Sequence, residues 1–266
     1  MLALCVGGVH VPSSQPLASL RGRVTAAAFA ATATLVSLGF GLSTLDRWLE
    51  RRRDHELAWT VALLLFAAGA LALWAGVATG WTGPIFRVFY LCGAILNVVT
   101  LAFGTLLLLV GSARVRPWTW VLIAFCGFAS GVVLAAPFEA AVPSEGLPTG
   151  RELFGPLPRI LASVASIGGA AVLVGGAGWT VIRLLGRGPD RTASDTRLMW
   201  ANVMIAVGVL ILGLGGAAFE EPTPFAATTG IGIAVVFAGF LLTNPSHPPH
   251  PPHPRHARRA QAPPSA

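Results

Sequence analysis

The chain has 266 residues, of which 54% are hydrophobic and only 11% are charged, and its formal net charge is +7. Soluble domains carry about 25% charged residues, so a chain this apolar could not cover its own surface in water. The composition excludes an ordinary soluble domain and predicts a protein that lies in a lipid bilayer. All 18 basic residues are Arg, and without a lysine amine a retinal Schiff base is excluded.

Long stretches without Asp, Glu or Arg recur along the sequence, and seven of them exceed the roughly 20 helical residues that cross a 30 Å hydrocarbon core. None of the 20 prolines falls in the middle of such a stretch. The pattern predicts an all-α membrane protein, a seven-transmembrane helix bundle over residues 24–243. The predicted spans lie near 24–45, 57–79, 85–111, 117–137, 157–184, 198–219 and 225–243.

Residues on either side of this domain lack the pattern of a span. We expect residues 1–23 to be a disordered N-terminal segment and residues 244–266 to be a disordered Pro/His/Arg-rich tail. Prolines in the tail separate four histidines that recur every third residue, His247, His250, His253 and His256. They lie about 9 Å apart in a polyproline II helix, so a disordered tail is favoured over a metal site.

Arginine is distributed unevenly between successive connections, and the positive-inside rule converts this asymmetry into an orientation. It places the N-terminus outside and the C-terminus in the cytoplasm. The segment 46–56 then forms a solvated basic turn on the cytoplasmic side, where anionic lipid headgroups are the expected partners in addition to the bilayer. The basic residues are thus assigned to topology rather than to nucleic acid. A cleaved signal peptide over the first window is the alternative, but it would leave that basic turn outside.

Predicted span three carries a stripe of small and polar residues at spacings of three and four, Tyr90, Gly93, Asn97, Thr100 and Gly104. Such a stripe occupies one face of a helix. It indicates either a packing face, where small residues let helices approach closely, or a polar pocket lined by Tyr90 and Asn97. Packing is favoured because small residues dominate the stripe.

Span six has a similar stripe, through Gly213 and Gly216, that ends at Glu220. At the outer end of the bundle, Glu220 and Glu139 are therefore candidate partners for Arg87. An arginine beside carboxylates could bind a polar headgroup or solute, although a structural ion pair at the interface is favoured.

Several kinds of site have no signature in this sequence. No Asp, Glu, Arg or His lies in the middle of a predicted span, where proton-coupled pumps need ionisable groups. The sequence also lacks nucleophile, phosphate-loop and metal-ligand motifs. The sequence therefore favours a protein without enzyme activity but does not decide the question, and it implies no cofactor.

Two stretches resemble a known family. The first runs from Asp46-Arg47-Trp48 through Arg51-Arg52-Arg53 to His55-Glu56-Leu57-Ala58-Trp59-Thr60, and the second covers residues 86–98. Both are similar to uncharacterised actinobacterial multi-pass integral membrane proteins, and this resemblance implies a bacterial plasma membrane. The resemblance implies no activity and no functional residues, but it directs attention to Arg87, Tyr90 and Asn97.

Together these patterns predict an integral membrane protein that packs around or senses a lipid-like molecule. One alternative is a small permease for an uncoupled or apolar solute, which requires a cavity along the Tyr90–Asn97 stripe. The other is an intramembrane enzyme acting on a lipid headgroup at the outer face, which requires Arg87, Glu139 and Glu220 to converge.

Overall fold

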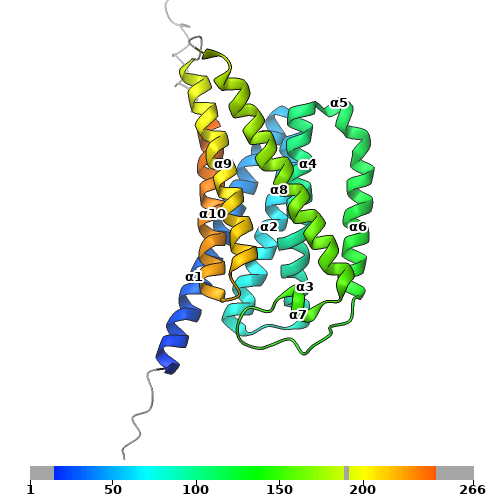
Figure 1. The fold of residues 1–266 in the computed structure, drawn as a ribbon, viewed down its shortest axis with the longest axis vertical. Helices are drawn as coiled ribbons and strands as arrows, with labels where there is room; N and C mark the ends of the chain where they lie inside the picture. The colour runs from blue at the N-terminus through cyan, green and yellow to red at the C-terminus, as the bar shows by residue number, and fades with distance from the viewer. Residues whose placement is uncertain (1–14, 189–191, 244–266) are drawn as a thin grey trace, which may run out of the picture.

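The structure, a computed structural model, describes residues 15–188 and 192–243, and every regular element in these ranges is helical (Figure 1). In chain order the elements are α1 (Gln15–Arg51), α2 (Asp54–Thr79), α3 (Gly83–Tyr90), the π-helix η1 (Leu91–Leu96), α4 (Asn97–Val110), α5 (Ser112–Val115), the 3-10 helix η2 (Arg116–Trp118), α6 (Thr119–Ala135), α7 (Gly150–Leu153), α8 (Pro156–Leu185), α9 (Ala193–Ala218) and α10 (Pro222–Thr243).

Seven helical stretches are long and apolar enough to cross a membrane, which confirms the predicted fold class. They are Leu20–Arg51, Asp54–Thr79, Gly83–Val110, Ser112–Ala135, Pro156–Leu185, Ala193–Gly216 and Pro222–Leu242. The third is continuous through α3, η1 and α4, and the fourth through α5, η2 and α6. The protein is an all-α multi-pass integral membrane protein.

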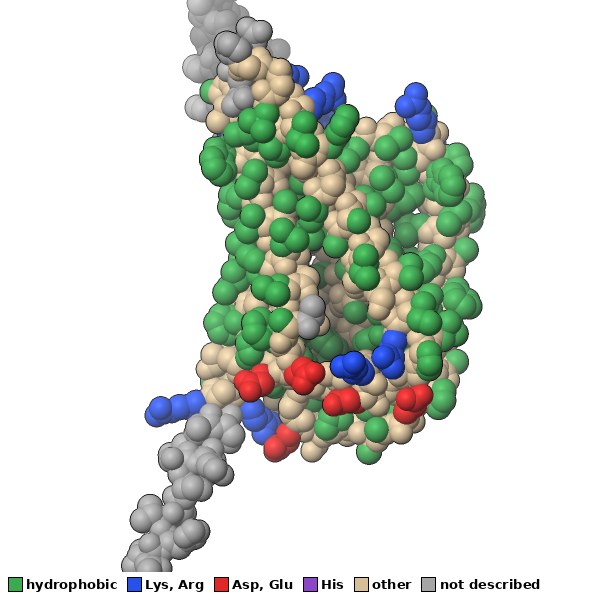
Figure 2. Space-filling view, viewed as in Figure 1, with side chains coloured by type: hydrophobic (Ala, Val, Ile, Leu, Met, Phe, Trp, Pro, Cys, Tyr) green, Lys and Arg blue, Asp and Glu red, His purple; other side chains and the backbone are tan. Residues whose placement is uncertain are grey.

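Charged and apolar side chains separate along the axis of the bundle. Figure 2 shows hydrophobic side chains over most of its length and charged side chains gathered at its two ends. The α1–α2, α4–α6 and α8–α9 connections form one end, which we call the Arg-rich end. The opposite end, which we call the loop end, contains residues 80–82, 136–155 and 219–221. An apolar band between two charged ends matches the profile of a bilayer.

The first helix differs from the prediction at both ends. It begins at Gln15 rather than at 24 and ends at Arg51 rather than at 45, because a helix continues past the bilayer wherever its residues favour helix. Residues 15–23 are thus helical, whereas residues 1–14 and the predicted tail at 244–266, with its four histidines, lie outside the described residues.

The basic segment 46–56 is not the solvated turn that we predicted. Helix α2 begins at Asp54, so only Arg52 and Arg53 connect the two helices, and Arg52 has a positive φ of 52°. Glu56 falls in the first turns of α2, where its side chain is only 3% exposed. The expectation of a solvated loop is therefore wrong for Glu56, because the α1–α2 hairpin closes over it.

The helices do not contribute equally to the interior. Helix α1 packs between α2 and α10, α9 packs on α10 and α8, and α4 packs between α2 and α8. Helix α6 stands at the edge of the bundle (Figure 1), and only 11% of the most apolar stretch of its span is buried, the smallest share of the seven. Helix α6 therefore presents most of its surface to lipid.

The long connection 136–155 folds back over the loop end of the bundle. Trp81 donates from Nε1 to the carbonyl oxygen of Gly146 at 2.8 Å. Leu153 and Phe154 are fully enclosed, and the ring of Phe154 stacks on that of Phe138 with centroids 5.4 Å apart. The end of this connection, Leu153 and Phe154, is thus part of the hydrophobic core, whereas residues 143–146 are exposed.

Close approach between α9 and α10 depends on glycines outside the predicted stripe of span six. A Cβ at Gly208 would lie 2.8 Å from the carbonyl oxygen of Gly232, whereas Gly213 and Gly216 face open space. Spacing of three and four residues marks several faces of one helix, and only the partner helix decides which of them packs.

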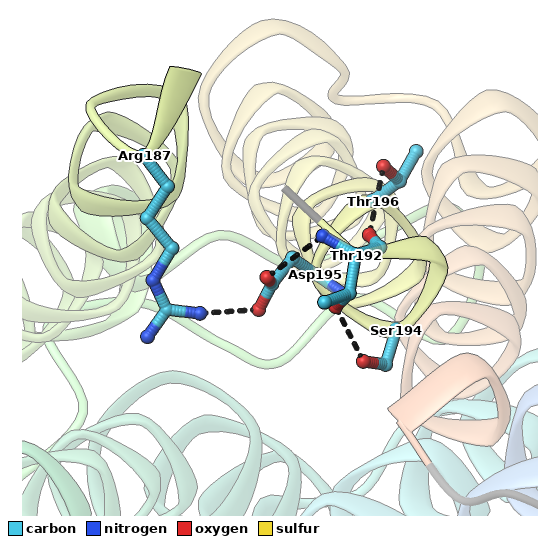
Figure 3. A network of polar contacts seen from close by, with 5 residues as sticks. All are labelled: Arg187, Thr192, Ser194, Asp195 and Thr196. Atoms are coloured by element: carbon cyan, nitrogen blue, oxygen red, sulfur yellow. Dashed lines mark hydrogen bonds and ion pairs between the residues drawn. The ribbon is translucent and has the colours of Figure 1, made fainter. Parts of the chain in front are cut away.

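The turn between α8 and α9 is closed by polar contacts at the Arg-rich end (Figure 3). Thr192 and Asp195 form a capping box, in which each side chain accepts a hydrogen bond from the backbone N–H of the other. Arg187, from the end of α8, forms an ion pair with the same Asp195. Satisfying the free N–H groups of a helix start fixes where α9 begins.

Candidate functional site

Arg87, which comes three residues before Tyr90 in the sequence, binds the end of a neighbouring helix. Its guanidinium donates hydrogen bonds to the carbonyl oxygens of Val133, Leu134 (3.0 Å) and Ala136 (2.7 Å). The last carbonyls of a helix have no partner within it and carry partial negative charge. Arg87 therefore caps α6.

Aromatic rings enclose the same guanidinium. Its central carbon lies 4.4 Å from the ring centroid of Phe138 and 5.8 Å from that of Phe154. Glu139 and Glu220 are both exposed, and within the described ranges neither forms an ion pair with Arg87. The structure thus does not bring these two carboxylates onto the arginine, which is satisfied by carbonyls and π faces instead.

Tyr90 belongs to the aromatic core at the loop end. Its ring centroid lies 5.0 Å from that of Phe154 and 5.8 Å from that of Phe86, and its hydroxyl donates a long, 3.4 Å hydrogen bond to the carbonyl oxygen of Pro158. A Cβ at Gly150 would collide with the tyrosine ring. The side chain is therefore held by packing on all these sides.

Asn97 lies deeper in the bundle, as the first residue of α4. Its side chain is 7% exposed, and its Oδ1 has no hydrogen-bond partner in the described part of the protein. On either side of Asn97, two glycines of the same stripe pack on α2. A Cβ at Gly104 would meet the ring of Trp59, and Gly93 lies against Gly69. Around Asn97, the stripe is therefore a helix-packing face.

Between Tyr90 and Asn97 the third span changes from α-helix to π-helix, which the sequence did not predict. In a π-helix the backbone bonds run from i to i+5, and such turns are rare in proteins. The carbonyl oxygen of Ala94, inside this turn, accepts a 3.0 Å hydrogen bond from Ser166 Oγ of α8. Gly93 in the same turn faces Gly69 of α2, and the missing side chain of Gly69 is what permits the close approach of the two helices.

A groove of about 400 Å³ lies between α2, α4 and α6, and none of the five candidate residues Arg87, Tyr90, Asn97, Glu139 and Glu220 lines it. The second helix contributes Val61 and Leu65, the third span Leu96 and Thr100, and the rest of the lining comes from α6. The α6 residues are Leu122, Ile123, Cys126, Gly127 and Ser130. No local sequence pattern predicts this groove, because it depends on how far α6 stands from its neighbours.

Metal ligands are not clustered in this bundle. Among residues 15–188 and 192–243, no three His, Cys, Asp or Glu side chains lie close enough together to hold a metal ion. Cys92 and Cys126 are free thiols.

Comparison with known proteins adds no relative. No protein-family model, no curated protein and no solved structure matches the chain. The family resemblance of residues 46–60 and 86–98 thus stays an expectation. What sequence and structure show together is an integral multi-pass membrane protein with an apolar groove between three of its spans.

Proposed function

We propose that this protein binds the hydrocarbon chain of a membrane lipid in the groove between α2, α4 and α6. The observation that carries the proposal is the groove itself, about 400 Å³ in volume and walled mainly by aliphatic side chains. Its volume is in the range of small-molecule sites, which occur preferentially between the helices of bundles.

The chemistry of the walls selects a hydrocarbon rather than a headgroup. Both hydroxyls of the lining are already used within their own helices, since Thr100 donates to the carbonyl oxygen of Leu96 at 2.7 Å and Ser130 to that of Cys126 at 2.7 Å. A polar ligand would lose its hydration and find no free donor here. A lipid chain would lose nothing and would gain close packing.

Depth in the membrane points to the same occupant. The groove residues Leu65, Thr100 and Ile123 fall near the middle of spans that run over Asp54–Thr79, Gly83–Val110 and Ser112–Ala135. At this level of a bilayer the surrounding solvent is lipid chain. Because α6 is the least buried of the seven spans, a chain can reach the groove from the side.

Filling the groove tests the proposal. Gly127 lines it, and no atom lies within 4 Å of a Cβ built there, so Gly127→Leu places a side chain in the groove without a clash at Cβ. With a phospholipid that carries a photoreactive group in mid-chain, we expect crosslinks to α6 in the wild-type protein and a several-fold loss in this variant. Mass spectrometry of the crosslinked peptides measures the effect.

Gly168→Leu is the matched control, because Gly168 of α8 is also exposed and also faces open space. It should leave the crosslinking of α6 unchanged. Equal crosslinking of α6 in the wild type and in Gly127→Leu would show that lipid only touches the outside of the bundle, and the groove would then have no ligand role.

We also propose that the Arg-rich end faces the cytoplasm of a bacterial plasma membrane and contacts anionic lipid headgroups. Exposed arginines at the α1–α2 turn support this, namely Arg51, Arg52 and Arg53, because cytoplasmic connections carry an excess of Arg. The N-terminus would then lie outside.

Cysteine accessibility in intact cells measures this orientation. In a background without native cysteines, we expect a membrane-impermeant maleimide to label Glu145→Cys directly and Arg53→Cys only after the cells are permeabilised. Both positions are exposed in the structure, so burial does not decide the result. Labelling of Arg53→Cys in intact cells would reverse the proposed topology.

A further inference from the structure

Helices α8 and α9 separate toward the loop end and leave a gap between them, which we call the α8–α9 opening (Figure 1). Further from that end the helices pack together, and Leu173 of α8 and Val209 of α9 belong to one hydrophobic cluster. Gly216 lies on the same face of α9 as Val209, yet it is exposed and a Cβ there would meet no atom within 4 Å. Gly168 of α8 is open in the same way. The space-filling view shows the resulting hollow close to the loop end (Figure 2).

Exposed charges of both signs lie on the elements that border this opening at the loop end. The start of α8 and the preceding α7 carry Arg159, Arg151 and Glu152, whereas the connection that follows α9 carries Glu220 and Glu221. Figure 2 shows acidic and basic side chains gathered beside the hollow. None of these five side chains forms an ion pair with another residue of the described ranges. Their charges are therefore available to a ligand.

The backbone at Arg159 is fixed by its neighbours. Pro158 is buried and its carbonyl oxygen accepts the hydrogen bond from the Tyr90 hydroxyl, and Arg159 lies close enough to Tyr90 to interact with it electrostatically. Arg159 belongs to the first turn of the span Pro156–Leu185, and Glu220 follows shortly after the span Ala193–Gly216 ends. Both charges therefore lie where the hydrocarbon of a bilayer meets its headgroups.

We propose that the α8–α9 opening binds a zwitterionic phospholipid, with its phosphate on Arg159 and its primary ammonium group on Glu220 and Glu221. The guanidinium fork of arginine matches the oxygens of a phosphate, and carboxylates accept charge-assisted hydrogen bonds from an ammonium group. Three glutamates beside two arginines repel a headgroup that carries only negative charge. A headgroup with one charge of each sign is complementary to the two sides of the opening.

The surface above the charged residues fits the rest of such a lipid. Toward the middle of their spans, α8 and α9 expose aliphatic side chains, among them Val164, Ile167 and Leu214. A phospholipid can place its chains against this surface while its headgroup reaches the loop end, whereas a water-soluble solute gains nothing from it. The site uses none of the residues that line the groove beside α6, so it does not depend on a lipid chain binding there.

Competition between two lipids in native mass spectrometry tests the proposal. The full-length protein, delipidated in detergent, is mixed with equal amounts of dioleoyl phosphatidylethanolamine and dioleoyl phosphatidylglycerol, which share their chains and phosphate and differ in the ammonium group. We expect the wild type to retain several-fold more of the phosphatidylethanolamine. Arg159→Gln should lower that retention several-fold. The double variant Glu220→Gln/Glu221→Gln should bind the two lipids equally, because it neither holds the ammonium group nor repels the anionic headgroup.

Two control variants separate this site from other lipid contacts. Arg197→Gln removes an exposed arginine near the Arg-rich end and should leave the retention of both lipids unchanged. Gly127→Leu fills the groove beside α6 and should keep the preference for phosphatidylethanolamine, so failure of one site is distinguishable from failure of the other. Equal retention of the two lipids by the wild type would overturn the proposal. A preference that persists in the glutamate double variant, or that disappears in Gly127→Leu, would do the same.

Discussion

The Arg87→Leu variant is expected to lose about 3 kcal/mol of stability or more, because it removes three hydrogen bonds to the end of α6 at once. Each carbonyl would be left without its charged donor, and the stacking on Phe138 and Phe154 would also be lost. For a chain of this size the loss corresponds to a drop in Tm on the order of 10 °C. Thermal unfolding of the purified protein in detergent, followed by tryptophan fluorescence, measures it.

Two further variants separate capping from ion pairing. Arg87→Lys keeps the charge, but a single ammonium cannot reach three carbonyl oxygens as a planar guanidinium does, so we expect an intermediate Tm. Glu139→Gln should leave Tm nearly unchanged, because the carboxylate is exposed and does not pair with Arg87. If Glu139→Gln instead lowered Tm as much as Arg87→Leu, an ion pair rather than the helix cap would hold the loop end together.

The Gly69→Ala variant is expected to destabilise the contact between α2 and the π-helix η1. A Cβ at Gly69 would lie 2.8 Å from both the Cα and the N of Gly93, and backbone atoms cannot rotate away as a side chain can. The two helices would have to separate at the centre of the bundle. Overpacking of this kind costs about 1–3 kcal/mol. A lower Tm and a smaller yield of monodisperse protein in size-exclusion chromatography are the expected results.

The reverse substitution at the same contact is the control. A Cβ at Gly93 would meet no atom closer than 4.0 Å, so Gly93→Ala should be tolerated even though it adds the same methyl group. Equal losses of Tm in the two variants would mean that the helices approach differently from the geometry described above.

The seven spans were predictable because the bilayer imposes a length and a composition on every helix that crosses it. Charge-free stretches therefore located each span, although the ends differed by several residues. Helix α1 begins at Gln15 and α2 at Asp54. Water at the membrane interface can hydrate both helical and non-helical backbone, so sequence alone does not decide where each helix begins.

The roles of the candidate residues were less accessible to sequence reasoning. Around Asn97 the two glycines of the stripe, Gly93 and Gly104, pack on α2, whereas Thr100 lines the groove toward α6. Arg87, in contrast, binds α6 carbonyls about 46 to 49 residues further along the chain, and backbone acceptors have no sequence signature. The carboxylates in the sequence therefore indicated Glu139 and Glu220 as partners, whereas Arg87 binds backbone carbonyl oxygens.

By itself the sequence determined that this chain is an all-α protein with seven membrane spans, because hydrophobicity and helix length are properties of contiguous residues. Only the tertiary structure decided that Glu56 is buried, that the third span contains a π-helix, and that α6 stands apart to leave an apolar groove. These features depend on the distances between helices. Side-chain packing between helices sets those distances, and a local sequence pattern does not encode it.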